Sequence, residues 1–216
     1  MIDFINAHSI STNKGNIIKI TKNNEILWQR PYKRQVMYIE ATSGQYIDIG
    51  LKATGNTDVY LEFNGNLVNI FVSRSSWSSN AFSLNAGGGK RAFNYGNYSQ
   101  SVNLTSTISQ TDNEWHKVSM VRGGICTIDS WSKTYGKYTF TTPNNLILFG
   151  CLTNGVMNSD SGSAKLSYFK MYEDGILVRD MIPVLDHYDI PCMYDKVTNQ
   201  LFYNNGTGEF IYKRSD

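Results

Sequence analysis

Apolar and polar residues alternate along most of this chain, in short runs separated by turn-forming residues. The clearest series occupies residues 165–210, KLSYFKMYEDGILVRDMIPVLDHYDIPCMYDKVTNQLFYNNGTGEF. Within it, the alternating runs 166–171 and 176–181 flank Glu173, Asp174 and Gly175. An Asp-Gly pair between two such runs predicts a β-hairpin. The pattern therefore predicts that antiparallel pairs complete the fold.

Two further turns lie in the same stretch. The turn Lys196-Val197-Thr198-Asn199 separates the apolar runs 192–194 and 201–203, and this arrangement predicts a second hairpin. Asn-Gly at 205–206 predicts a third turn, ahead of the apolar run 210–212. Four or five short strands are therefore expected in this stretch.

The middle of the chain shows the same period of two. We expect a first strand pair at 36–40 and 45–50, and a second at 58–63 and 67–72, with Asn-Gly-Asn at 64–66 as its hairpin turn. No apolar 3.6-residue period extends over ten residues or more, so no long helix is predicted. Further strands are expected at residues 81–84, 91–95, 100–104, 114–122, 125–128, 137–141 and 146–149.

These strands and turns predict an all-β fold, an antiparallel two-sheet sandwich of the jelly-roll kind. At 216 residues, the chain is long enough for one such domain with a buried core that needs no disulfide bonds. Each of the three cysteines, Cys126, Cys151 and Cys192, lies in an apolar or strand-like run, so we expect small buried side chains.

The first part of the chain, residues 1–32, is expected to be a separate small unit, with the main domain at 33–216. Strands at 17–20 and 25–28 flank a turn with two asparagines. A two-stranded hairpin is marginal in water, so its apolar face needs a partner: the main domain, a second copy of the chain or another protein. The residues expected to make this attachment are Ile18, Ile20, Ile26 or Leu27, and Trp28.

Charge and hydropathy exclude two classes of partner. The formal net charge is +2, with 20 basic and 18 acidic residues, and the basic residues do not cluster. A nucleic-acid interface needs a basic stripe, so no nucleic-acid partner is expected. No run approaches the roughly 20 apolar residues that span a bilayer, so no membrane span is expected. The opening MIDFINAHSISTNKG lacks the basic and apolar regions of a secretory signal.

Several of these runs resemble a known family. The segments QYIDIG, DVYLEF, EWHKVSMVRGG and LILFG, in that order, resemble laminin-G-like and concanavalin-A-like jelly rolls. The closing SYFKMYEDGILVRDMIPVLD and CMYDKVTNQLFYNNGTGEF resemble the tail of laminin-G-like domains in bacteriophage structural proteins and bacterial surface proteins. The resemblance covers about residues 36–213. It implies a concanavalin-A-like jelly roll and is nearly silent on the ligand.

Concanavalin-A-like folds include glycosidases, which need two carboxylates at a fixed separation. The strand motif Glu-x-Asp-x-x-Glu of the related glucanases is absent here. The chain has three histidines, and His116 follows Trp115 in a predicted core strand, where a packed, hydrogen-bonded role is expected. No nucleophile elbow accompanies any of them. We therefore expect a protein that is not an enzyme.

Laminin-G-like domains often bind calcium, which takes carboxylate and carbonyl oxygens from loops. Asp186 and Asp189 are loop carboxylates that could serve, and solvated turn residues are the alternative reading. No cofactor is otherwise expected, and the resemblance makes bound calcium a possibility.

Sugar binding would use aromatic rings and planar polar groups on loops beside a sheet. The candidates are Trp77, Arg91, Tyr95 and Tyr98, from the loop-rich region 73–98. Trp77 lies in a serine-rich loop, and packing of its ring onto its own domain is the alternative.

The combined expectation is a non-catalytic bacteriophage virion protein, a fibre, tail or capsid-decoration component. Its N-terminal unit would bind other virion proteins or form a homo-oligomer, and its jelly roll would adhere to host-surface or mucus glycans. The first alternative is a secreted or surface-bound bacterial lectin-like domain. The second is a glycosidase of the same fold.

Overall fold

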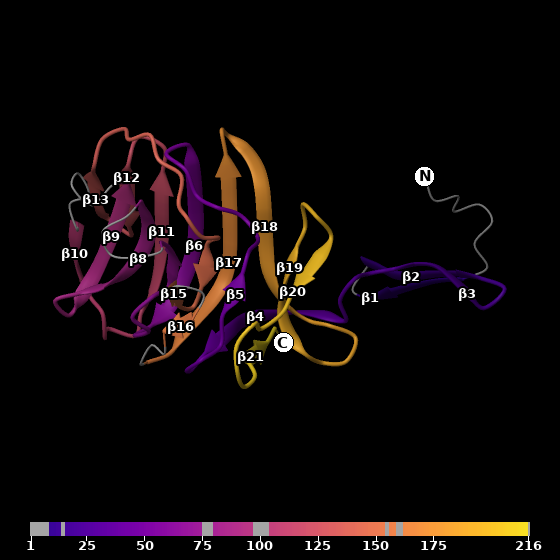
Figure 1. Cartoon of the computed structure of the whole chain (residues 1–216). Helices are drawn as coiled ribbons and strands as arrows, with labels where there is room; N and C mark the ends of the chain where they lie inside the picture. Colours follow the sequence, from indigo (N-terminus) through magenta and orange to yellow (C-terminus); the bar gives the residue numbers. More distant parts are fainter. Residues whose placement is uncertain are drawn as a thin grey trace.

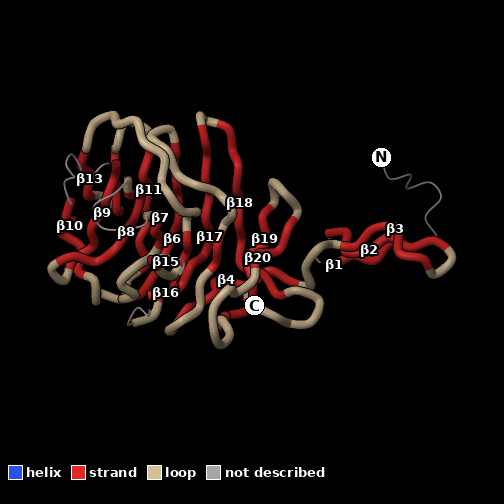
Figure 2. The backbone as a smooth tube through the Cα atoms, in the orientation of Figure 1, coloured by secondary structure: helices blue, strands red, loops and turns tan. Residues whose placement is uncertain are grey.

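The computed structural model describes residues 9–13, 16–74, 80–96, 104–153, 156–158 and 162–215. All of the regular secondary structure in these residues is β-strand, and the strand pairings are antiparallel (Figures 1 and 2). The all-β, antiparallel prediction is therefore confirmed. The strands form two large sheets, a small N-terminal sheet and a two-stranded ribbon.

The smaller of the two large sheets has the strand order β10-β9-β8-β7-β14-β5. Its strands are β5 (Ile47–Asp48), β7 (Phe71–Ser73), β8 (Ala81–Gly87), β9 (Lys90–Gly96), β10 (Leu104–Ser109) and β14 (Ile147–Leu148). The adjacent ribbon pairs β15 (Cys151–Thr153) with β16 (Val156–Asn158).

The larger sheet has the order β13-β12-β11-β6-β17-β4-β18-β19-β20, and β21 also pairs with β4. Its strands are β4 (Arg34–Ala41), β6 (Thr57–Gly65), β11 (Trp115–Val121), β12 (Ile125–Ile128), β13 (Trp131–Thr134), β17 (Ala164–Glu173), β18 (Ile176–Leu185), β19 (Pro191–Asp195), β20 (Gln200–Phe202) and β21 (Ile211–Arg214).

One hydrophobic core joins the two sheets. Leu61 and Phe63 of β6 are fully buried in it, together with Phe82 and Phe93 of the smaller sheet. The Arg91 guanidinium of β9 lies 5.0 Å from the centre of the Phe63 ring of β6. Burying each large apolar side chain contributes about 1.5–3 kcal/mol, so this shared core holds the sheets face to face as a sandwich.

Two predicted hairpins are confirmed. Strands β17 and β18 pair directly across the predicted Asp-Gly turn. Asp174 (φ 51°) and Gly175 (φ 82°) both have positive φ, as a type I′ turn requires. Strands β19 and β20 likewise pair across residues 196–199, with Asn199 at φ 57°.

The hairpin predicted at residues 64–66 is wrong. Strand β6 lies in the larger sheet and β7 in the smaller, so these residues carry the chain from one sheet to the other. The amides of Asn66 and Leu67 instead donate to the Ser163 carbonyl, at 2.8 and 2.9 Å. A Cβ atom at Gly65 would lie 2.3 Å from that carbonyl oxygen. Gly65 is therefore needed for close backbone approach and not for a tight turn.

The first expected strand pair is wrong for the same reason. Strand β4 belongs to the larger sheet, whereas β5 pairs with β14 in the smaller one. Between them, the buried Gln45 side chain accepts hydrogen bonds from the amides of Thr42 (3.0 Å) and Ser43 (2.9 Å). A turn held by a side chain in this way redirects the chain across the sandwich.

Residues 205–206 lead to β21, close to the run expected at 210–212, and β21 pairs with β4. One other segment differs from the predictions. Residues 137–141 form no regular strand and cross the end of the sandwich, joined to the loop before β6 by a single bridge between Thr54 and Thr141.

The N-terminal sheet has three strands where two were predicted: β1 (Ser9–Asn13), β2 (Asn16–Lys22) and β3 (Glu25–Gln29). Ile10, Ile20 and Trp28 are cross-strand partners and so share one face. Figure 1 shows this sheet extending from the side of the sandwich that carries β19 and β20.

Candidate functional site: a tyrosine-lined face of the larger sheet

Strand β6 presents its alternate side chains to opposite sides of the larger sheet. Val59, Leu61 and Phe63 are fully buried in the core. The residues between them therefore point to the outer face of the sheet. Tyr60 is one of these, and 37% of its surface is exposed.

The neighbouring strand β17 adds aromatic residues to the same outer face. Its register with β6 shifts between Leu166 and Tyr168, so Ser167 is an extra residue. Beyond this bulge, Tyr168, Lys170 and Tyr172 pair with the outward-facing positions of β6. The bulge thus aims three consecutive alternate residues outward. We refer to the surface formed by Tyr60, Tyr168, Lys170 and Tyr172 as the tyrosine face.

The tyrosine face encloses a shallow depression of about 500 Å³. The rings of Tyr60 and Tyr172 lie edge to face, with centroids 5.8 Å apart and an interplanar angle of 83°. This is a favourable geometry for an aromatic pair. The pair holds both rings in place at the outer surface, where an apolar ring face can receive a ligand.

Polar groups surround these rings. Lys170 Nζ lies 3.8 Å from Asp180 Oδ1 on β18, and Ser167 Oγ donates to Glu62 Oε2 at 2.6 Å. Burial raises the pKa of the Tyr60 phenol, with a further rise from Asp58, and burial and Glu62 raise the pKa of Tyr168. Both phenols are therefore neutral at physiological pH and able to donate and accept hydrogen bonds.

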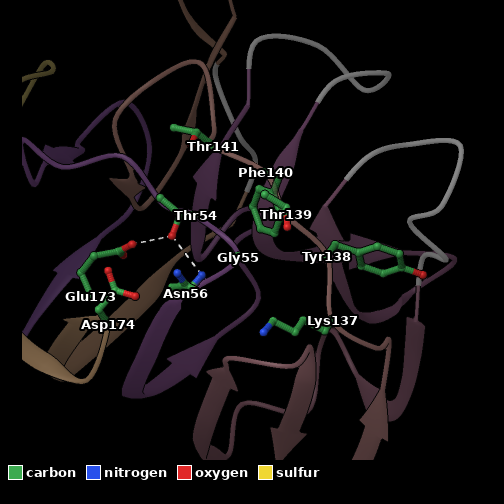
Figure 3. A pocket seen from close by; sticks show the side chains of 10 residues that line it. All are labelled: Thr54, Gly55, Asn56, Lys137, Tyr138, Thr139, Phe140, Thr141, Glu173 and Asp174. Atoms are coloured by element: carbon green, nitrogen blue, oxygen red, sulfur yellow. Dashed lines mark hydrogen bonds between the residues drawn. The ribbon is translucent and has the colours of Figure 1, made fainter.

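A second depression lies at the end of the sandwich, and Figure 3 shows it from close by. We call it the rim groove; its volume is about 310 Å³. It lies between the loop before β6, the crossing segment and the β17–β18 turn. The residues that line it are Thr54, Gly55, Asn56, Lys137, Tyr138, Thr139, Phe140, Thr141, Glu173 and Asp174.

The carboxylate in the rim groove supports the fold. Glu173 accepts a hydrogen bond from the Thr54 hydroxyl at one oxygen and from the Thr57 hydroxyl at the other, the latter at 2.6 Å. Figure 3 shows the Tyr138 side chain directed away from Thr54 and Glu173. The rim groove is therefore polar, and it presents no ring platform comparable with the tyrosine face.

Two of the residues expected to bind a ligand lie in the interior instead. Arg91 is 1% exposed and donates to the carbonyls of Leu67 (2.7 Å) and Gly65 (2.5 Å). Tyr95 is fully buried, and its hydroxyl donates to the Gly55 carbonyl at 2.9 Å. Both side chains hold the two sheets and their connecting loops together, so neither is available to a ligand at the surface. The other two expected residues, Trp77 and Tyr98, lie outside the described residues.

The two loop carboxylates that could serve as calcium ligands, Asp186 and Asp189, have protein partners. One oxygen of Asp186 accepts from the amides of Tyr188 (2.8 Å) and Ile190 (2.9 Å), and the other from the Tyr203 hydroxyl (3.1 Å). Asp189 forms an ion pair with Lys33 at 2.6 Å. Within the described ranges, no group of three or more His, Cys, Asp or Glu side chains could hold a metal ion. In this structure the Asp186 carboxylate closes a turn.

The residues expected to attach a partner differ in their exposure. Ile20 is 1% exposed in the middle of the N-terminal sheet, whereas Ile26 is 55% exposed, and Ile18 and Trp28 are partly buried. Only Ile26 of this set therefore presents most of its side chain to solvent.

His116 is packed and hydrogen bonded, as predicted. Its ring nitrogens lie 2.6 Å from Asp129 and 2.9 Å from Asp112, and 5% of the residue is exposed. All three cysteines are buried thiols, also as predicted.

The sequence analysis did not single out the tyrosine face. Two features of the sequence indicate this face. Tyr168, Lys170 and Tyr172 are alternate residues, and Tyr60 is the aromatic residue of DVYLEF that lies outside the core. The pairing of two strands about a hundred residues apart in the chain brings these side chains together, and a single sequence does not reveal that pairing.

Comparisons with protein-family models and with curated proteins both found no match to this chain. Among the described residues, no helix has the length and apolar character to cross a membrane.

Proposed function

We propose that this protein is a non-catalytic carbohydrate-binding module, and that the tyrosine face is its binding surface. The observation that carries the proposal is the Tyr60–Tyr172 ring pair, which is held edge to face on the outer side of the larger sheet beside Lys170 and Tyr168. Sugars present apolar C–H faces and a rim of hydroxyls. The aromatic rings can stack against the C–H faces of a sugar. The neutral phenols, the Lys170 ammonium group and the nearby carboxylates can form hydrogen bonds with its hydroxyls.

We further propose that the sandwich is a laminin-G-like jelly roll carried by a bacteriophage particle. The support for this setting is the resemblance of the closing strands to bacteriophage structural proteins, together with the two-sheet antiparallel architecture. The N-terminal sheet, which extends from the sandwich (Figure 1), would join it to other virion proteins or to further copies of the chain. A bacterial surface lectin would use the same tyrosine face, and the genes beside this one distinguish the two settings.

A glycan array tests the binding function. The array carries homologous series of β-1,4-linked glucose, β-1,4-linked N-acetylglucosamine, β-1,3-linked glucose and α-1,4-linked glucose, from single sugars to hexasaccharides. The wild-type protein should bind at least one series. The Tyr60→Ala and Tyr172→Ala variants should each bind it about tenfold more weakly, a loss of about 1.4 kcal/mol.

Tyr188→Ala is the matched control, because Tyr188 is 85% exposed in a loop away from the tyrosine face. Its binding should equal that of the wild type. The proposal fails if the wild-type protein binds none of the series, or if Tyr60→Ala and Tyr172→Ala bind as tightly as the control.

A further inference from the structure

A second aromatic cluster lies on the same outer face of the larger sheet. Trp115 of β11 pairs with Asn64 of β6, an outward position like Tyr60, and Trp115 is 41% exposed. The Tyr38 ring of β4 lies 6.0 Å from the Trp115 ring. Lys165 of β17 places its ammonium 5.6 Å from the Tyr38 ring. We refer to Tyr38, Trp115 and Lys165 as the tryptophan cluster.

The two clusters are separated along the strands. Tyr60 and Asn64 mark their positions on β6, and a strand rises about 3.3 Å per residue, so four residues correspond to about 13 Å. The surface between them carries Glu62 of β6, which faces Lys117 of β11 on one side and Tyr168 of β17 on the other. Two ring platforms therefore flank a polar strip on one continuous sheet face.

This spacing suits an extended chain. A single sugar ring covers one aromatic platform, whereas an oligosaccharide of several units can place one sugar on each platform and its hydroxyls along the polar strip.

The charges on this face are balanced. Lys170 lies beside Asp180 at 3.8 Å, Lys117 faces Glu62 across β11 and β6, and Lys165 faces Glu40 across β17 and β4. The Asp180, Glu62 and Glu40 carboxylates lie opposite these three ammonium groups, and Asp180 also pairs with Lys196 at 3.7 Å. The face therefore has no large excess of either sign. A polyanion such as a nucleic acid or an acidic polysaccharide needs uncompensated positive charge. The face therefore favours an uncharged ligand.

We propose that the tyrosine face and the tryptophan cluster are two ends of one binding surface, and that its ligand is a neutral, extended oligosaccharide chain running along β6 and β17, between β4 and β11. This inference rests on the proposed function and specifies its ligand class.

Isothermal titration with the homologous series that binds on the array tests the inference. For the wild-type protein, affinity should rise with chain length until the chain spans both clusters, and then level off. Trp115→Ala should bind the hexasaccharide about tenfold more weakly than the wild type does, and it should bind the disaccharide with unchanged affinity. Trp115→Phe keeps an aromatic ring and should therefore retain part of the affinity for the hexasaccharide that Trp115→Ala loses. Oligogalacturonides, the acidic probe, should bind more weakly than the neutral chains.

The outcomes separate the two proposals. If the wild-type protein binds no glycan, both are wrong. If it binds but its affinity is independent of chain length, or if Trp115→Ala binds the hexasaccharide as the wild type does, the tyrosine face stands and the extended surface is wrong. Tighter binding of the acidic probe would overturn the assignment of a neutral ligand. Thermal unfolding of each variant checks that the Trp115 substitutions leave the sandwich folded, and Tyr188→Ala is again the matched control.

Discussion

His116 Nδ1 lies 2.6 Å from Asp129 Oδ2, and this contact joins β11 to the turn between β12 and β13. The other ring nitrogen lies 2.9 Å from Asp112. Burial lowers the pKa of His116, but the hydrogen bonds and charges of Asp112 and Asp129 outweigh it, so the net pKa is raised above its usual 6.5. The protonated ring donates to both carboxylates and thereby connects β11 to the loop before it and to the β12–β13 turn.

The raised pKa of His116 predicts a stability that depends on pH. A folded-state pKa above the unfolded value stabilises the protein fully below about pH 6.5. This stabilisation is lost as the pH rises through the raised folded-state pKa. Urea unfolding between about pH 5 and about pH 9 should show the decline, and His116→Gln should flatten it. His187→Gln, a substitution in an exposed loop, should leave it in place. An unchanged profile in His116→Gln would contradict the assignment.

Replacing the buried Arg91 should destabilise the sandwich strongly. Burial lowers the pKa of its guanidinium to about 10, and the group donates to carbonyls of the crossover between β6 and β7. Arg91→Met leaves these acceptors unsatisfied, so the free energy of unfolding should fall by roughly 3 kcal/mol. Arg91→Lys should lose less, because an ammonium retains donors. Lys90→Ala, at the exposed neighbouring residue, should be close to neutral. A small effect of Arg91→Met in chemical denaturation would be inconsistent with this role.

Gly55 should tolerate no side chain. A Cβ atom there would lie 2.0 Å from the Tyr138 carbonyl oxygen, and the Gly55 amide donates to Phe140 at 3.1 Å. Gly55→Ala must therefore displace the crossing segment at residues 137–141, at a cost of about 1–3 kcal/mol. The thermal unfolding midpoint of Gly55→Ala should be lower than that of Asn56→Ala, a substitution at the exposed neighbouring residue. Equal midpoints for the two variants would show that residues 137–141 can move to accommodate the methyl group without loss of stability.

Removing residues 1–30 should leave the sandwich folded. The described residues of its main core begin at Val36. The segment to be removed contacts the sandwich through His187, whose ring lies 3.0 Å from the Gln29 amide nitrogen and 2.9 Å from the Arg30 carbonyl oxygen. The truncated protein should unfold cooperatively near the wild-type midpoint. A longer truncation, through Ala41, removes β4 and should prevent folding. Loss of cooperative unfolding in the shorter truncation would place the N-terminal sheet in the folding unit.

Local patterns predicted the strands better than their partners. The turn at Asp174-Gly175 forms the expected hairpin, because both residues adopt positive φ and the strands on either side stay in one sheet. Asn64-Gly65 carries the same local signal but leads to the other sheet. The difference lies in the Ser163 carbonyl, which binds the chain just after Gly65. That contact is distant in sequence, so no local pattern could show it.

The candidate site was less predictable than the fold. Arg91 and Tyr95 are polar and aromatic residues of a region rich in predicted loops, but both lie on β9 and point into the core. In the sequence, Tyr60 is one position of the alternating run 58–63, and Tyr172 lies between an alternating run and a turn. Strand alternation shows that one face of β6 is outward, but the cross-strand register and the bulge at Ser167 decide which rings meet. Those features arise only when the sheet is assembled.

The central strand β4 has consequences for how the chain is made. It is the first strand of the larger sheet along the chain, yet one of its partners, β21, is the last. The ribosome synthesises β21 long after β4, so until β21 emerges part of β4 has an open edge that other chains can join. Topologies with such distant pairings fold slowly. Production of this protein should therefore benefit from slow translation at low temperature, and chains that lack β21 should aggregate.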